Sequence, residues 1–116
     1  MIEDKGCEKM TVFVVETYVV KPEKQAEFKS LLKRFLRFMK ENPTLFKEIK
    51  SWKLFTQTFG SISGAYVEQI EYDSLAEHEK CHTRLLKDKE YMKLYQEAMT
   101  LIDATTFSMS AMEPVT

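Results

Sequence analysis

The chain has 116 residues, which suits one domain that buries roughly 60–70% of its unfolded surface. Its 17 Lys and Arg residues nearly balance its 18 Asp and Glu residues, so no long-range field favours nucleic acid or an anionic membrane as a partner. Cys7 and Cys81 have neither zinc-site spacing nor a disulfide pattern, which makes the cytoplasm the expected compartment. No apolar run is long enough to span a membrane, and residues 1–9 lack the layout of a signal peptide. We expect a flexible tail over 1–9 and a single domain over 10–113.

Residues Thr11 to Val20 are dense in β-branched and aromatic side chains, which predicts a strand. Both alternating sets are apolar, so both faces of this strand need cover. The two sets are Phe13, Val15 and Val19 on one face and Val12, Val14 and Val20 on the other. A chain of this length has helices for one face only, and we therefore expect a partner subunit to cover the second in a homodimer.

A helix is predicted from Pro22 to Glu41, followed by the stop signal Asn42-Pro43. Its apolar residues recur every three or four positions, and its basic residues gather on the opposite side as a solvated face rather than an anion site. The apolar stripe is Phe28, Leu31, Leu32, Phe35 and Met39, and the basic side is Lys29, Lys33, Arg37 and Lys40.

Two antiparallel strands are predicted at Ile49 to Phe59 and Ala65 to Asp73, joined by a hairpin loop from Gly60 to Gly64. If the hairpin is symmetric about Ile62, Trp52 lies opposite Tyr72, and Lys53 lies opposite Glu71 on the other face. The face with Trp52 is the more apolar of the two, and Glu68 is the one carboxylate on it.

Ser74 and Glu77 form a capping box that opens a helix extending to Leu86. We expect its inward stripe to consist of Leu75, His78, His82, Leu85 and Leu86. Asp88 caps a further helix, and Thr105 to Met112 alternates as a last strand. The expected inward residues of that further helix are Tyr91, Leu94, Tyr95, Ala98 and Ile102.

The predicted order of strand, helix, two strands, two helices and strand is typical of an α+β, ferredoxin-like split βαβ fold. This fold has a four-stranded antiparallel sheet with helices on one face. Its open apolar face favours back-to-back pairing of two sheets, which gives a dimeric α+β barrel.

His78 and His82 lie one helical turn apart and allow three interpretations. They could hold a metal with Glu68 or Glu16 as a third ligand, they could bind or transfer protons in a pocket, or they could simply pack in the core. The string HEKCH matches the H-E-x-x-H pattern of metalloproteases, where Glu79 would activate a zinc-bound water. The chain has no later histidine to complete that site, and we predict no metal.

Glu16 interrupts an otherwise apolar strand and shares its face with Tyr18. If it is buried, its pKa rises and it can act as a base, whereas a cross-strand ion pair or a water-facing edge would leave it ordinary. Trp52 and Tyr72 could stack on a flat ligand or serve only as core or dimer contacts.

The segment YDSLAEHEKCHTRLLKDKEYMKLY resembles the exit of the third strand and the second helical segment of NIPSNAP-like proteins. There an aromatic-Asp-Ser-Leu-Ala run and a Leu-Leu-x-Asp-x-Glu-aromatic turn are typical. Residues Thr11 to Met112 are compatible with the wider dimeric α+β barrel superfamily, which includes antibiotic-biosynthesis-monooxygenase-like and EthD-like proteins. The resemblance implies a homodimer and, in enzymatic members, a small-molecule pocket between sheet and helices.

Two classes of function follow from these patterns. One is a small-molecule-binding protein or monooxygenase-like enzyme that uses no cofactor and acts on an apolar or aromatic substrate. The other is a non-enzymatic homodimeric interaction module. For the first class the catalytic candidates are His82, His78 and Glu16, and the ligand-binding candidates are Tyr18, Trp52, Glu68 and Tyr72.

Overall fold

In the computed structural model, residues 11–60 and 64–115 are described, and they contain one antiparallel sheet. Its strands are β1 (Val12–Val20), β2 (Ser51–Thr56), β3 (Tyr66–Tyr72) and β4 (Ile102–Met112), in the spatial order β2-β3-β1-β4. The expected N-terminal tail over 1–9 and the middle of the Gly60–Gly64 loop lie outside the described residues.

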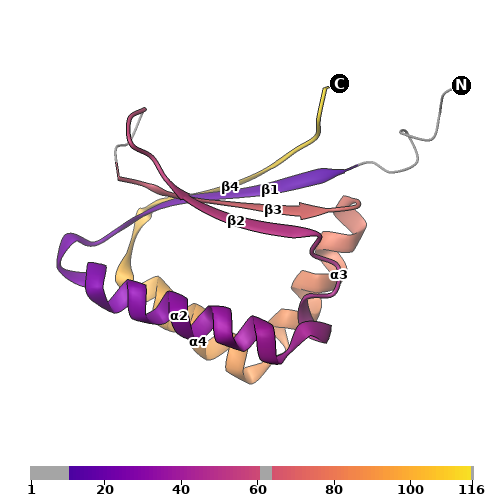
Figure 1. Cartoon of the computed structure of the whole chain (residues 1–116), viewed down its shortest axis with the longest axis horizontal. Coiled ribbons are helices and arrows are strands. Elements are labelled where there is room, and N and C mark those ends of the chain that lie inside the picture. The colour runs from indigo at the N-terminus through magenta and orange to yellow at the C-terminus, as the bar shows by residue number, and fades with distance from the viewer. Residues whose placement is uncertain (1–10, 61–63, 116) are drawn as a thin grey trace, which may run out of the picture.

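The helices form a second layer on one side of the sheet (Figure 1). They are η1 (Pro22–Lys24), α2 (Gln25–Glu41), η2 (Pro43–Phe46), α3 (Leu75–Leu86) and α4 (Lys89–Leu101). This arrangement confirms the predicted α+β, ferredoxin-like fold with helices on one face.

Both predicted helix caps after β3 are present. The backbone N–H of Glu77 donates to Ser74 Oγ at 3.2 Å, and the N–H of Tyr91 donates to Asp88 Oδ1 at 2.8 Å. Each bond satisfies a donor that the first helical turn leaves without a partner. These caps fix where α3 and α4 begin.

The two faces of β1 differ in burial. Val12, Val14 and Val20 are buried beneath the helices, whereas Phe13 and Val15 on the opposite face are only half-buried. The core beneath the helices divides into two clusters, one around Val12, Phe38 and Cys81 and one around Tyr18, Phe28 and Leu101. The predicted two-sided apolar pattern is therefore present, and none of the described helices lies over the second face.

The register predicted for the hairpin is wrong by two residues. Trp52 pairs with Ile70 rather than Tyr72, and Lys53 pairs with Gln69 rather than Glu71. The observed pairs are symmetric about a point one residue earlier in the chain than Ile62. Each residue of β2 therefore pairs with the β3 residue two positions before the predicted one. Because side chains in a strand alternate with a period of two, every side chain keeps its predicted face.

The inward face predicted for α3 is correct for Leu85, which is buried, and wrong for Leu75 and Leu86, which are exposed. Cys81 and Leu85 are the buried residues of this helix, His78 is half-buried, and Leu75, His82 and Leu86 are exposed. The short helix meets the end of the sheet and η2 rather than the middle of the sheet, which turns Cys81 inward (Figure 1). The Sγ atom of Cys81 lies 3.5 Å from the carbonyl oxygen of Leu45, which is part of η2.

The last strand begins earlier than predicted. It follows α4 directly at Ile102, which was expected to be the last inward residue of the helix, rather than starting at Thr105. The pairing of β1 with β4 shifts between Thr17 and Val19, and the Val19 N–H donates to Thr106 Oγ1 at 2.9 Å across this irregularity.

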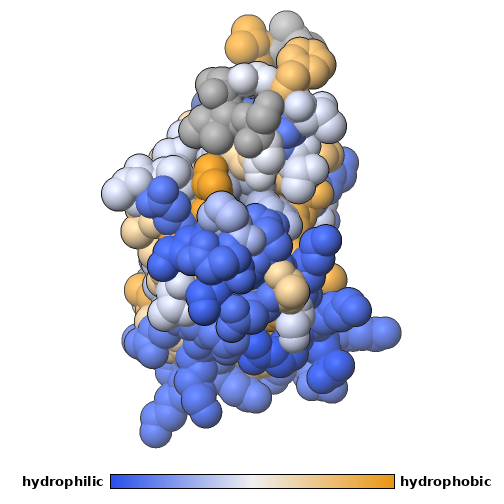
Figure 2. All heavy atoms as spheres, turned by 90° about the vertical axis from the view of Figure 1, so that its left-hand side faces the viewer, coloured by the Kyte–Doolittle hydropathy of each residue, from blue (hydrophilic) through white to orange (hydrophobic). Residues whose placement is uncertain are grey.

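The basic side of α2 is solvated, as predicted. Lys29, Lys33, Arg37 and Lys40 are exposed. Figure 2 views the end of the molecule where β1 runs toward α2 and shows hydrophilic side chains gathered over the helical layer. Across the described ranges 11–60 and 64–115, no helix combines the length and apolar character needed to cross a membrane.

Candidate functional site

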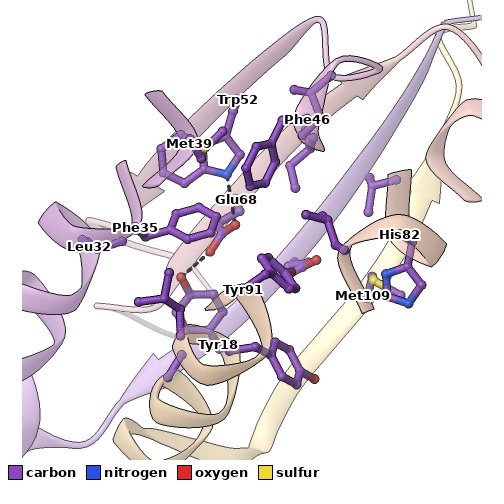
Figure 3. Close-up of a pocket in the computed structure, with 18 of the residues that line it drawn as sticks. Tyr18, Leu32, Phe35, Met39, Phe46, Trp52, Glu68, His82, Tyr91 and Met109 are labelled. Carbon is purple, nitrogen blue, oxygen red and sulfur yellow. Dashed lines mark hydrogen bonds between the residues drawn. The ribbon is translucent and has the colours of Figure 1, made fainter. Parts of the chain in front are cut away.

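A cavity of about 390 Å³ lies between the inner face of the sheet and the helices. It is lined by members of both core clusters (Figure 3). All seven residues proposed from the sequence line it, although they come from three strands and one helix. They are Glu16, Tyr18, Trp52, Glu68, Tyr72, His78 and His82.

Glu16 and Glu68 form the polar part of the sheet wall. They are directly paired across β1 and β3, so both side chains leave the sheet on its helical side. Apolar or aromatic residues flank them along each strand, with Val14 and Tyr18 beside Glu16 and Tyr66 beside Glu68. Two carboxyl groups thus share one mostly apolar cavity.

The Glu68 carboxylate is held on both oxygens by aromatic donors (Figure 3). Tyr18 Oη donates to Oε2 at 2.6 Å, and Trp52 Nε1 donates to Oε1 at 3.1 Å. The Tyr18 ring stacks on Tyr66 at 5.9 Å and meets the edge of Phe28 at 5.8 Å. Burial, followed by the charge of Glu68, raises the pKa of Tyr18, so its hydroxyl keeps its proton and remains a donor. The network fixes the orientation of Glu68.

Glu16 has no such partners. Within the described parts of the chain its carboxyl group makes no hydrogen bond and no ion pair. Burial, and then the charge of Glu68, raise the pKa of Glu16 to about 7. A carboxyl group with this pKa exchanges a proton near neutral pH, which is the property that a general base or acid needs.

The histidines lie where α3 approaches the sheet. The Tyr72 and His78 rings meet edge to face at 5.0 Å, and the His78 and His82 rings stack at 5.7 Å. Burial, and then His82, lower the pKa of His78. No group of three or more His, Cys, Asp or Glu residues suited to a metal ion occurs in residues 11–60 and 64–115. The structure therefore offers no third ligand of these types to the histidine pair.

The cavity has a closed end and a more exposed side. At the closed end Tyr18 is 5% exposed, and Trp52 and Glu68 lie beside it. Met109 of β4 is 54% exposed, and it appears with the exposed His82 on the opposite side of the cavity in Figure 3. His82 thus borders the entrance of the cavity. The sequence pattern instead predicts a position at the centre of a buried stripe.

The helices contribute aromatic walls that the sequence interpretation did not assign to a site. Phe35 of α2 lies 6.2 Å from the Trp52 ring and 6.3 Å from the Tyr91 ring of α4, measured between centroids. Tyr95, one turn after Tyr91, also lines the cavity. These residues were predicted only as inward stripes of their helices. The sequence signal that could have identified them is the presence of tyrosine hydroxyls on an inward stripe. A buried hydroxyl needs a polar partner or water, and so indicates a polar site or a cavity.

The sequence model of the NIPSNAP family matches residues 13–112. The chain belongs to the NIPSNAP family. A search of curated protein sequences found no match to this NIPSNAP chain.

Solved structures agree with this assignment at the level of the fold. A NIPSNAP family protein from Agrobacterium tumefaciens superposes with a TM-score of 0.72 at 15% identity, covering 91% of this chain and 87% of the other. A NIPSNAP-like domain protein from Burkholderia xenovorans gives 0.65 at 13% identity, with 93% and 88% coverage. A mutant of SnoaB from Streptomyces nogalater, a cofactor-independent oxygenase, gives 0.62 at 15% identity, with 91% and 94% coverage.

Proposed function

We propose that the cavity binds a small molecule with a flat apolar or aromatic body and that Glu16 acts on it as a general base. The observation that carries this proposal is the unpartnered Glu16 carboxyl group, set in an aromatic cavity with a pKa of about 7. A side chain that only filled the core would need partners for its oxygens, and Glu16 has none among the described residues.

A base in such a cavity supports oxygenation without a cofactor. Glu16 removes a proton from an acidified carbon of the substrate, and the resulting carbanion reduces dioxygen. In the balanced reaction an activated methylene and O₂ give a carbonyl and water, so the carbon is oxidised and one oxygen atom leaves as water. The fold shared with SnoaB, a cofactor-independent oxygenase, supports this class of reaction for the NIPSNAP chain.

Trp52 makes the proposal simple to test, because it is the one tryptophan of the chain and its ring borders the cavity. Binders found among aromatic and quinone-like compounds should change its fluorescence, and their oxygen uptake measures turnover. We expect Glu16→Gln to lower turnover by on the order of 100-fold, with Glu23→Gln on the exposed surface as the matched control. Equal turnover by Glu16→Gln and the wild type would exclude Glu16 as the base.

We also propose that two copies pair through the open face of the sheet. Val15 and Val67 are half-buried there, and Phe55 and Met112 are 49% and 50% exposed. An apolar sheet face of this kind in contact with water favours association. The proposed dimer leaves the cavity free, since the cavity lies on the helical side of each sheet.

A further inference from the structure

The cavity has an uneven charge. Its lining contains two carboxyl groups, Glu16 and Glu68, and two histidines, but no lysine or arginine. The hydrogen-bond donors to Glu68 are the neutral Tyr18 hydroxyl and the Trp52 N–H, which orient the carboxylate without neutralising it. Among the described residues, no lysine or arginine therefore balances the carboxyl pair within the lining of this cavity.

The rings around the pair present aromatic surfaces to the same space. Trp52, Phe35 and Tyr91 come from three different elements, and their centroids lie 6.2 and 6.3 Å apart in the two pairs that include Phe35. Tyr18 closes the far end beside Glu68 (Figure 3). Aromatic faces attract cations through their negative quadrupole, and tryptophan does so best. Carboxylates beside such faces add a direct charge attraction.

We propose that the ligand of this cavity carries a cationic nitrogen, a substituted ammonium group on an apolar body, held between Glu16 and Glu68 and the rings of Trp52, Phe35 and Tyr91. This inference rests on the proposed small-molecule binding, but it does not depend on catalysis. A neutral aromatic ligand would use the rings and leave the paired carboxyl groups without a counter-charge, whereas an ammonium group uses both.

Proton linkage follows from the same arrangement. Without a ligand, Glu16 holds a proton over part of the neutral range, because burial and Glu68 raise its pKa to about 7. A bound cation would favour the ionised carboxylate and displace that proton. The titratable groups that act on Glu16 or share its cavity are Glu68 of β3, Tyr18 of β1, Tyr72 of β3, Tyr91 and Tyr95 of α4, and His78 and His82 of α3. Burial raises the pKa of Tyr18, Tyr72 and Tyr91, so these three hydroxyls stay neutral. Affinity should therefore increase as pH rises through about 7.

The test compares two ligands of the same shape. Benzyltrimethylammonium and its neutral carbon isostere, neopentylbenzene, are titrated into the full chain at pH 8 and constant ionic strength, followed by Trp52 fluorescence. We expect the cation to bind on the order of tenfold more tightly than the neutral compound. Calorimetry in buffers of different ionisation enthalpy at pH 7 should show proton release on binding of the cation.

Glu16→Gln is the diagnostic variant, because it removes the charge and breaks no hydrogen bond of the described structure. It should reduce the preference for the cation and abolish the proton release, while Glu23→Gln changes neither. Equal binding of both compounds by the wild type would overturn the cationic ligand. A preference fully retained by Glu16→Gln would overturn the contact between the cation and Glu16. Either result leaves the proposed small-molecule binding standing. Binding of neither compound would count against both.

Discussion

Glu16 on β1 and Glu68 on β3 stand directly opposite each other, yet among the described residues only Glu68 has hydrogen-bond donors for its carboxylate. The Glu68 carboxyl group is therefore held in one orientation, whereas Glu16, with a pKa of about 7, is free to exchange a proton. The two glutamates thus differ in their chemistry because the side chains around them differ.

This difference predicts a pH dependence of stability. The folded state binds the Glu16 proton more tightly than the unfolded state, since the pKa rises from 4.5 to about 7 on folding. Ionisation therefore costs stability, and the wild type should lose stability as pH rises from about 4.5 to about 7. Thermal melts of Glu16→Gln should show a higher midpoint than the wild type at pH 8 and a similar one at pH 4. A Glu16→Gln variant less stable than the wild type at pH 8 would contradict the burial of this charge.

Tyr18→Phe removes the donor to Glu68 Oε2 and leaves the stacked ring in place. We expect a loss of about 1–2 kcal/mol in the free energy of unfolding, since a partly buried carboxylate oxygen loses its bond. Urea titration measures this change. A double-mutant cycle with Glu68→Gln isolates the bond, and additive effects of the two substitutions would mean that the Tyr18–Glu68 bond contributes nothing.

Glu48 and Arg84 attach α3 to the segment before β2. Arg84 Nη1 donates to Glu48 Oε1 at 2.8 Å and to the Leu45 carbonyl at 3.2 Å, and the hydrogen bond from Arg84 holds the pKa of Glu48 at about 2. Because this pKa is depressed, the pair stabilises the fold above about pH 4.5 and the effect is lost as pH falls toward 2.

Glu48→Gln should therefore lower the melting midpoint by several degrees at pH 7 and change it little near pH 2. The matched control is Lys50→Met, which breaks the exposed Lys50–Asp73 pair and should shift the midpoint far less. Similar shifts for both variants at pH 7 would show that burial of Glu48 is unimportant.

Val15→Glu places a charge on the open sheet face and should convert the proposed dimer into a monomer in light scattering. Leu36→Glu is the control, because Leu36 is exposed on α2, on the other side of the molecule. A monomeric wild type at micromolar concentration would end the dimer proposal, as would a Val15→Glu variant that stays dimeric.

His82→Gln tests the candidate whose position the structure revised. Since this ring is exposed at the entrance, we expect a stability change below about 0.5 kcal/mol and a small change in ligand turnover. A loss on the order of 100-fold would instead assign proton transfer to His82. His78→Gln, which alters the half-buried neighbour, provides the comparison.

Much of the fold could be predicted because its signals are local. The Ser74 and Asp88 caps, the alternation in β1 and the glycines of the hairpin each depend on a few adjacent residues. The hairpin register could not be predicted, since it depends on where the turn is centred. Similarly, the sequence periodicity of α3 could not distinguish a face toward the sheet from a face toward η2.

The candidate site was predictable where strand alternation decides the direction of a side chain. Glu16, Tyr18 and Glu68 share one face for that reason, and the paired register brings them together. The aromatic walls from α2 and α4 were not predictable as site residues. An inward stripe that fills a core and one that borders a cavity have the same spacing, and only the packing of Phe35 against Trp52 and Tyr91 distinguishes them.

The absence of a loop between α4 and β4 has a mechanical consequence. Leu101 ends the helix and Ile102 begins the strand, so a shift of α4 cannot be absorbed by slack between them. Tyr95 and Met99 of α4 line the cavity, and Met112 of β4 lies on the face proposed for pairing. A ligand that displaces α4 would therefore also move β4, and the two events would be thermodynamically linked. By reciprocity, dimerisation would change ligand affinity by the same factor by which the ligand changes dimerisation.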